Sequence, residues 1–143
     1  MTIVGDLIAR LAAIDPPVFR MVAGAIEFAA ISEAAPPATP AAFVMTVEEA
    51  SGENQRMGDQ VMQRMEADVA VVICTENLAD RAGAAAAGDI EELKAVVRGE
   101  VLGWQPPSAI EPMTHVSGAL LKARGGLVWF EDRYAAVTYL IAN

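Results

Sequence analysis

VMQRMEADVAVVIC, residues 61–74, is the stretch that decides the fold of this chain. Apolar residues occupy alternate positions, with Gln63 as the exception, and this period of two predicts a long β-strand. The opposite face starts polar and becomes apolar at Ala70, Val72 and Cys74. One face should therefore pack on helices along its whole length, and the second apolar patch needs a cover, for which a neighbouring subunit is one candidate. The positions of the first face are Val61, Met65, Ala67, Val69, Val71 and Ile73.

Two segments predict the helices that would cover the first face. The earlier one starts after Thr2, a capping residue, and ends before the pair Pro16 and Pro17. Its apolar stripe consists of Ile3, Leu7, Leu11 and Ile14. The later one covers residues 83–102, with acidic residues near its start and Lys94 and Arg98 further along, as the helix dipole favours. Its apolar side consists of Ile90, Leu93, Val97 and Val101.

The later helix has a marked end in VLGWQPP, residues 101–107. Gly103 stands where a left-handed residue closes a helix, and Pro106 follows where a helix cannot continue. Trp104 could pack back onto the helix or stack on a ligand, and its large apolar area just past a helix end favours packing. Trp129 is likewise assigned to the core.

The remaining segments predict further strands. Residues 113–142 contain two strand runs joined by Gly125 and Gly126, the tight-turn pair of a hairpin, and the second run should bend or bulge near Glu131 and Asp132. Short strands are expected at residues 18–22 and 41–47, separated by a turn with some helix at 24–32 and a Pro/Ala connector at 33–41. This order predicts a single α+β domain over residues 1–143. It should hold a mostly antiparallel sheet of four to five strands with two helices packed on one face.

EEASGENQRMGD, residues 48–59, has no periodicity and predicts an exposed, mobile loop. Together with the second apolar patch it supplies the candidate surface for contact with another subunit or with a larger assembly. The residues of that candidate surface are Glu48, Glu49, Glu53, Asn54, Gln55, Arg56, Asp59, Ala70 and Val72.

Composition narrows the classes of function. The net charge of −9 and the pI near 4.5 disfavour a tightly held nucleic acid, because phosphate binding rests on Lys and Arg. Cys74 is the one cysteine, which excludes an intrachain disulfide, and its apolar context predicts a small buried residue and not a nucleophile. The start of the chain lacks the basic leader of a signal peptide, and no apolar run reaches the length of a membrane helix.

The sequence motifs of catalysis are weak or incomplete. GAAAAGDI, residues 83–90, has the outer spacing of a phosphate loop, but Asp89 and Ile90 replace the Lys and Ser/Thr that must follow. His115 is the one histidine, which excludes metal sites built on paired histidines and indicates a hydrogen-bonded structural residue. Ser117 shares its strand face but lacks the context of a nucleophile. We therefore expect no catalytic residue, no metal and no cofactor.

The order of local signatures resembles the small tail terminator, or tail-completion, proteins of long-tailed phages and gene transfer agents. These signatures are PAAFVM (40–45), VVICTEN (71–77), VLGWQPP (101–107), THVSGALL (114–121) and LVWFEDRY (127–134), with a polar loop before the long strand. They extend over most of the chain from Pro40 onward.

The resemblance implies a ring, usually a hexamer, at the head-proximal end of the tail tube, assembled in the bacterial cytoplasm. Such a ring stops tube growth and contacts the tail tube protein and a head-side connector or stopper, and it has no catalytic residues. DNA would pass through its bore without tight binding, helped by carboxylates that face the bore, although acidity also serves solubility alone. Another head-tail adaptor, such as a stopper, or a small α+β enzyme stays open as an alternative.

Overall fold

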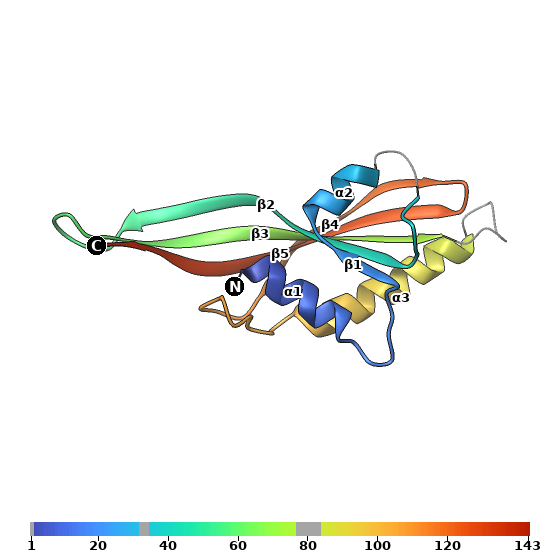
Figure 1. Cartoon of the computed structure of the whole chain (residues 1–143), viewed down its shortest axis with the longest axis horizontal. Helices are drawn as coiled ribbons and strands as arrows, with labels where there is room; N and C mark the ends of the chain where they lie inside the picture. The colour runs from blue at the N-terminus through green and yellow to red at the C-terminus, as the bar shows by residue number, and fades with distance from the viewer. Residues whose placement is uncertain (1, 32–34, 77–83) are drawn as a thin grey trace.

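Five strands form one sheet in the order β1-β2-β3-β5-β4 (Figure 1). The computed structural model describes residues 2–31, 35–76 and 84–143. β1 is parallel to β2, and the other three pairings are antiparallel. The predicted α+β class with a mostly antiparallel sheet is confirmed. The elements are α1 (Ile3–Ala12), β1 (Met21–Ala23), α2 (Ala25–Ile31), β2 (Ala41–Asn54), β3 (Val61–Glu76), α3 (Ala84–Val101), β4 (Thr114–Arg124) and β5 (Leu127–Ala142).

α1 and α3 lie on one face of the sheet, as the two apolar stripes predicted (Figure 1). The hydroxyl of Thr2 accepts a hydrogen bond from the backbone N–H of Gly5 and so caps α1. The main core between these helices and the sheet contains Leu7, Leu11, Val97 and Val101 together with the odd-numbered apolar residues of β3 from Ala67 to Ile73. Five positions of the predicted segments and motifs lie outside the described residues, namely Ser32, Glu33, Ala34, Asn77 and Gly83.

A third helix, α2, lies on the opposite face of the sheet, where the sequence indicated a turn with some helix (Figure 1). Phe28 of α2 packs with its ring centroid 5.5 Å from that of Phe43 and 5.9 Å from that of Trp129. These aromatic rings form a second, smaller core with Ala41, Val72 and Cys74.

The second apolar patch does need a cover, but α2 of the same chain and not a neighbouring subunit covers Val72 and Cys74. Ala70 and Val72 are both buried, so neither offers a surface to a neighbouring subunit. The sequence did not identify this cover, because a helix of seven residues is too short to show a helical period.

The prediction of a loop over residues 48–59 is also wrong for its first half. β2 continues to Asn54, and Glu49 and Asn54 pair with Ala67 and Gln63 of β3. All side chains of residues 46–54 are exposed, so this half of the strand has no buried face and no apolar alternation to reveal it. The connection that remains between the two strands is residues 55–60.

The C-terminal hairpin turns at Gly125 and Gly126, whose φ values of +61° and +83° favour glycine at both positions. The predicted irregularity is present in the partner strand and not in β5. β4 shifts register between His115 and Ser117 and again between Leu120 and Lys122, whereas β5 pairs with β3 without interruption. β5 is held by a strand on each side, while an edge strand such as β4 can take up an extra residue.

α3 ends at Val101, and Gly103 follows with a φ of +76°. The backbone N–H of Gly103 donates to the carbonyl of Met113, so the chain folds back toward the helix end. Trp104 is half-buried against the main core. The guanidinium carbon of Arg10 in α1 lies 4.7 Å from the centre of the Trp104 ring system.

Candidate functional site

The most distinctive surface of the molecule is an arm formed by the outer ends of β2, β3 and β5. We define the arm as residues 46–66 and 138–142. It extends beyond the helices to the β2–β3 turn, and the C-terminus lies beside that turn (Figure 1). Most of the sheet is covered by helices on at least one face, but this part is not. No described helix covers either face of this three-stranded part of the sheet, although Glu111 of the connection between α3 and β4 contacts Arg64 there.

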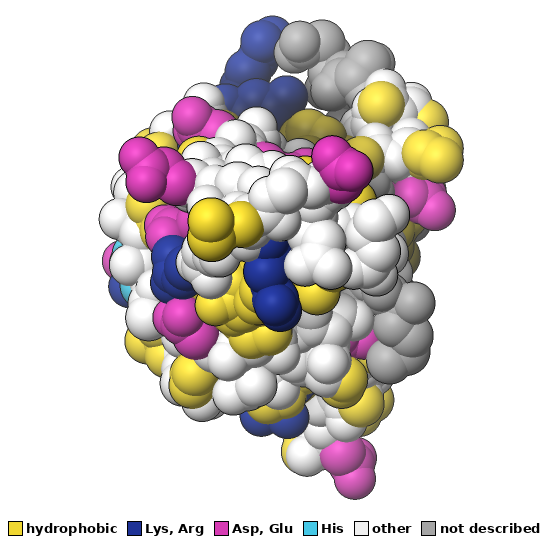
Figure 2. All heavy atoms as spheres, turned by 90° about the vertical axis from the view of Figure 1, so that its left-hand side faces the viewer, with side chains coloured by type: hydrophobic (Ala, Val, Ile, Leu, Met, Phe, Trp, Pro, Cys, Tyr) yellow, Lys and Arg dark blue, Asp and Glu magenta, His cyan; other side chains and the backbone are white. Residues whose placement is uncertain are grey.

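Apolar and charged side chains mix on the arm. Met57 in the turn is 90% exposed, and Ile141 near the end of β5 is 65% exposed. Val47 and Leu140 are also exposed. Figure 2 looks onto the free end of the arm, where hydrophobic and charged side chains lie next to one another. Exposed apolar side chains interspersed with charges are typical of a surface that meets a partner in the presence of water.

Asn54 holds the tip of the arm together. Its Oδ1 accepts hydrogen bonds from the backbone N–H groups of Met62 at 2.8 Å and Arg56 at 3.1 Å. Its Nδ2 donates to the carbonyl of Gln60 at 3.1 Å. The side chain of Gln63 donates to the carbonyl of Gly52 where the β2–β3 register shifts. Side chains of the arm itself therefore hold the tip in its conformation. Asn54 stabilises the turn, and its role is structural before it is one of contact with a partner.

An ion pair ties the arm to the body of the protein. Arg64 of β3 donates to both carboxylate oxygens of Glu111, at 2.9 and 3.1 Å. Glu111 lies in the connection between α3 and β4. Both side chains are well exposed, so this pair orients the arm more than it adds to stability.

The sequence-predicted surface residues divide into two groups. Glu48, Glu49 and Glu53 lie on β2, and Gln55, Arg56 and Asp59 lie in the turn, so the arm brings these six together with Asn54. Ala70 and Val72 are in the core and do not join them.

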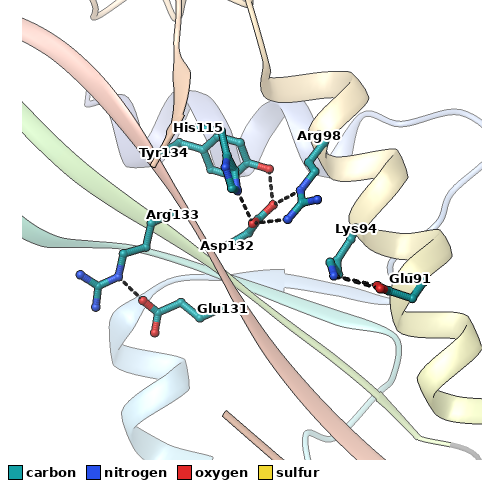
Figure 3. A network of polar contacts seen from close by, with 8 residues as sticks. All are labelled: Glu91, Lys94, Arg98, His115, Glu131, Asp132, Arg133 and Tyr134. Atoms are coloured by element: carbon teal, nitrogen blue, oxygen red, sulfur yellow. Dashed lines mark hydrogen bonds and ion pairs between the residues drawn. The ribbon is translucent and has the colours of Figure 1, made fainter. Parts of the chain in front are cut away.

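A charged cluster around the buried Asp132 joins α3, β4 and β5 (Figure 3). Arg98 donates to both carboxylate oxygens of Asp132, at 2.9 and 3.0 Å. The Tyr134 hydroxyl donates to Asp132 at 2.6 Å, and His115 Nε2 lies 2.6 Å from the same carboxylate. On the opposite face of β5, Glu131 pairs with Arg133.

The environment of Asp132 favours its charged form. Burial alone would raise the pKa of Asp132, but the hydrogen bonds from Arg98, Tyr134 and His115 outweigh it and lower that pKa. Burial and the contact with Asp132 raise the pKa of Tyr134, which stays a neutral donor. Both carboxylate oxygens are engaged, so the cluster acts as a tie between three elements.

Sequence reasoning identified His115 as a hydrogen-bonded residue but missed its partners. The available signal was the alternation Phe130, Asp132, Tyr134 in β5, which places a carboxylate among core-facing aromatic residues. An acidic residue on the buried face of a strand calls for a cationic partner, and Arg98 is the one that α3 supplies.

Within the described residues, no group of three His, Cys, Asp or Glu side chains is arranged to hold a metal ion. In the same part of the chain, no helix combines the length and apolar character needed to cross a membrane.

A comparison with protein families gives one match, to the phage tail terminator protein family, over residues 3–142. No curated protein matches the chain. The family match includes the N-terminal helix as well as the arm and both hairpins. Because it extends over nearly the whole sequence, the chain belongs to the phage tail terminator family, and its role is a structural one in the phage tail.

Proposed function

We propose that this protein forms a ring, a hexamer by analogy with the family, that caps the head-proximal end of the tail tube. The ring stops tube growth and joins the tail to the connector or stopper protein of the head. It would serve a long-tailed phage or a gene transfer agent and assemble in the bacterial cytoplasm. The observation that carries the proposal is the arm, a stiff sheet extension with exposed side chains on a protein of the tail terminator family.

The arm suits contact with the last ring of tube subunits. Its three strands continue the sheet of the body. β5 pairs with β3 without interruption, and β2 pairs with β3 with register shifts between Thr46 and Glu48 and between Ser51 and Asn54. Its surface combines Glu48, Glu49 and Glu53 with Arg56 and exposed apolar residues such as Met57. Such a mixed surface gives specific but partly hydrated contacts with a protein partner.

The acidic balance suits a protein around a DNA path. A net charge of −9 repels phosphates wherever carboxylates face the bore, which keeps the passing DNA from binding tightly. The competing explanation, that the charge serves solubility, remains open. Measuring whether DNA passes through the tail in variants with neutralised carboxylates would distinguish these two explanations.

The test is to assemble particles without this protein and to examine the tails and heads separately by electron microscopy. Terminator function predicts tails of uncontrolled length that do not join to filled heads. Addition of the purified protein during assembly should restore tails of one length. Tails of normal length together with heads that lose their DNA would indicate a stopper instead, and normal particles would exclude both roles.

A further inference from the structure

The sheet has two long open strand edges. β4 is the last strand on one side and pairs only with β5 among the described residues. On the other side, β1 covers only Ala41, Ala42 and Phe43 of β2, which leaves residues 46–54 with no strand beyond them in the described part of the chain. An open edge presents unpaired backbone N–H and C=O groups that can pair with another strand.

The two edges carry opposite charge. Residues 46–54 of β2 hold Glu48, Glu49 and Glu53 and no Lys or Arg. β4 holds Lys122 and Arg124 and no Asp or Glu. Opposite charges on neighbouring strands stabilise a sheet and like charges destabilise it. The charges thus favour contact between unlike edges and disfavour pairing of either edge with itself.

Strand directions also agree with this contact. Because β2, β3, β5 and β4 are successively antiparallel, β4 runs opposite to β2. When copies point the same way around a ring, β4 of one copy meets β2 of the next as an antiparallel pair. Such a contact uses two different surfaces, and repeated contacts of that kind close into a ring when the rotation allows it.

In a closed sheet, the tilt of the strands would decide how the two edges meet. Thr114 pairs with Ala135, which pairs with Asp68, which pairs with Glu48, so β4 begins level with Glu48. Four strands at ~4.8 Å spacing span ~19 Å, and a tilt of ~35–45° shifts the next copy by ~13–19 Å, or ~4–6 residues. Toward the β2–β3 turn, this shift moves Thr114 to about the level of Glu53 and brings Lys122 close to Glu48. In the opposite direction it would place β4 beside the residues that β1 already covers, so only the first direction fits the open part of β2.

From these features we infer that β4 adds to the open edge of β2 in a second copy of this chain, so that the sheets continue from subunit to subunit. This interface rests on the proposed ring and specifies how it is built. Exposed Val116, Leu120 and Leu121 on β4 and Val47 on β2 add apolar area to it. The register shifts of β4 fix where the ladder can form. In other proteins such shifts protect an open edge from pairing with another strand. The experiment below distinguishes an edge that pairs from an edge that is protected.

The first arm of the experiment reverses charges. Lys122→Glu on β4, or Glu48→Lys on β2, should each reduce the protein found in purified tails about tenfold or more, because the loss repeats at every interface. The two changes together should restore incorporation. The matched control, Glu92→Lys in α3, alters an exposed charge away from both edges and should leave incorporation unchanged. Circular dichroism melting verifies that each variant is folded.

The second arm uses cysteines. Ser117→Cys on β4 combined with Ala50→Cys or Ser51→Cys on β2 should give disulfide-linked multimers from purified tails under oxidation, and each single variant should not. Native Cys74 is buried and does not interfere. Incorporation that is insensitive to both charge reversals, failure of the combined variant to recover, or absence of crosslinks overturns the edge contact. If the edge contact is overturned but the wild-type protein is present in tails of normal length, the proposed function is still supported. If the wild-type protein is absent from tails, the proposed function itself is contradicted.

Discussion

Arg98 of α3 and Asp132 of β5 form a two-pronged ion pair, with Arg98 Nε and Nη2 at 2.9 and 3.0 Å from the two carboxylate oxygens. The Asp132 side chain is fully buried, while that of Arg98 is about a third exposed. This contact fastens the longest helix to the central sheet at the point where His115 and Tyr134 also converge. The stability of the body should therefore depend strongly on one carboxylate.

Asp132→Asn should lower the free energy of unfolding by about 3 kcal/mol, because it removes one partner of a buried pair and leaves the other without compensation. This loss of unfolding free energy is at the low end of the range for buried ion pairs, because Arg98 retains contact with water. Urea denaturation followed by circular dichroism measures the change. The control is Glu131→Gln on the opposite face of β5, which removes a more exposed pair and should cost less than about 1 kcal/mol. Equal losses of unfolding free energy in the two variants would show that the Asp132 cluster stabilises the protein no more than the pair of Glu131 and Arg133 does.

The same cluster predicts how stability depends on pH. The pKa of Asp132 is lowered in the folded protein, so its contribution is present above the unfolded-state value of about 3.9 and is lost as pH falls through the folded-state value. The difference in unfolding free energy between the parent and Asp132→Asn should thus be constant near neutral pH and shrink in acid. Urea titrations at a series of pH values test this. A difference that grows on acidification would contradict the assignment.

The reaction rate of the Cys74 thiol measures how well α2 covers the second core. Burial raises the pKa of the Cys74 thiol to about 12, so the folded protein should react slowly with a thiol reagent at pH 8, where an unfolded thiol with a pKa of about 8.5 reacts readily. Phe28→Ala removes the ring that packs on Phe43 and Trp129 and should increase the labelling rate by about tenfold or more by loosening α2. The control Ile26→Ala changes a side chain of α2 that is 85% exposed and should leave the rate unchanged. Rapid labelling of the parent protein would contradict the buried position.

The two tryptophans should differ in their effect on stability. Trp129 is 2% exposed and contacts three elements of the second core, so Trp129→Ala should cost about 3–5 kcal/mol. Trp104 is half-buried beside Arg10, so Trp104→Ala should cost about half as much. Denaturant titrations by circular dichroism measure both. A larger loss for Trp104→Ala would mean that the α3 end, and not the second core, limits stability.

The parts of the fold that could be predicted from the sequence are those with one buried face. The alternation in β3 and the stripes of α1 and α3 leave a periodic signal because burial selects apolar residues at fixed intervals. α2 was predicted only as a turn with some helix, because its seven residues hold only two side chains, Phe28 and Ile31, that pack on the second core. The outer half of β2 escaped because neither of its faces is buried. The irregularity predicted near Glu131 of β5 occurs in β4 instead, because β4 is the edge strand. The order of strands in the sheet cannot be deduced from local sequence.

The candidate surface was predicted in part for the same physical reason. Residues from Glu48 to Asp59 stood out because they are polar and aperiodic, and the structure places them together on the arm. Ala70 and Val72 were assigned to the surface because the predicted turn with some helix at 24–32 was not recognised as a cover. Val72 packs in the second core, and Ala70 is also buried. Asp132 and Arg98, 34 residues apart in the sequence, could be paired only once the topology was known.

The outer part of the arm, residues 52–64 and those after Tyr139, can be removed without entering the core. Ser51 and Met65 are Cα partners in the β2–β3 ladder, so a two-residue Asn-Gly turn can join them in place of residues 52–64. Ending this variant at Tyr139 also removes the part of β5 that would lose its partner strand. Because the removed side chains are exposed or only half-buried, the shortened protein should fold, with a melting temperature within several degrees of the parent.

If the arm contacts the tail tube, the shortened protein should be folded yet fail to produce tails of one length, as measured by electron microscopy of assembled particles. Met57→Ser in the intact arm is a milder change, because it removes only the most exposed apolar side chain at the tip, and should weaken tube contact without altering the fold. Gln63→Ala should loosen the hairpin at Gly52 while leaving the tip side chains in place, which separates stiffness from contact chemistry. Normal infectious particles containing the folded, shortened protein would show that the outer part of the arm is dispensable and that the tube contact lies elsewhere on the protein.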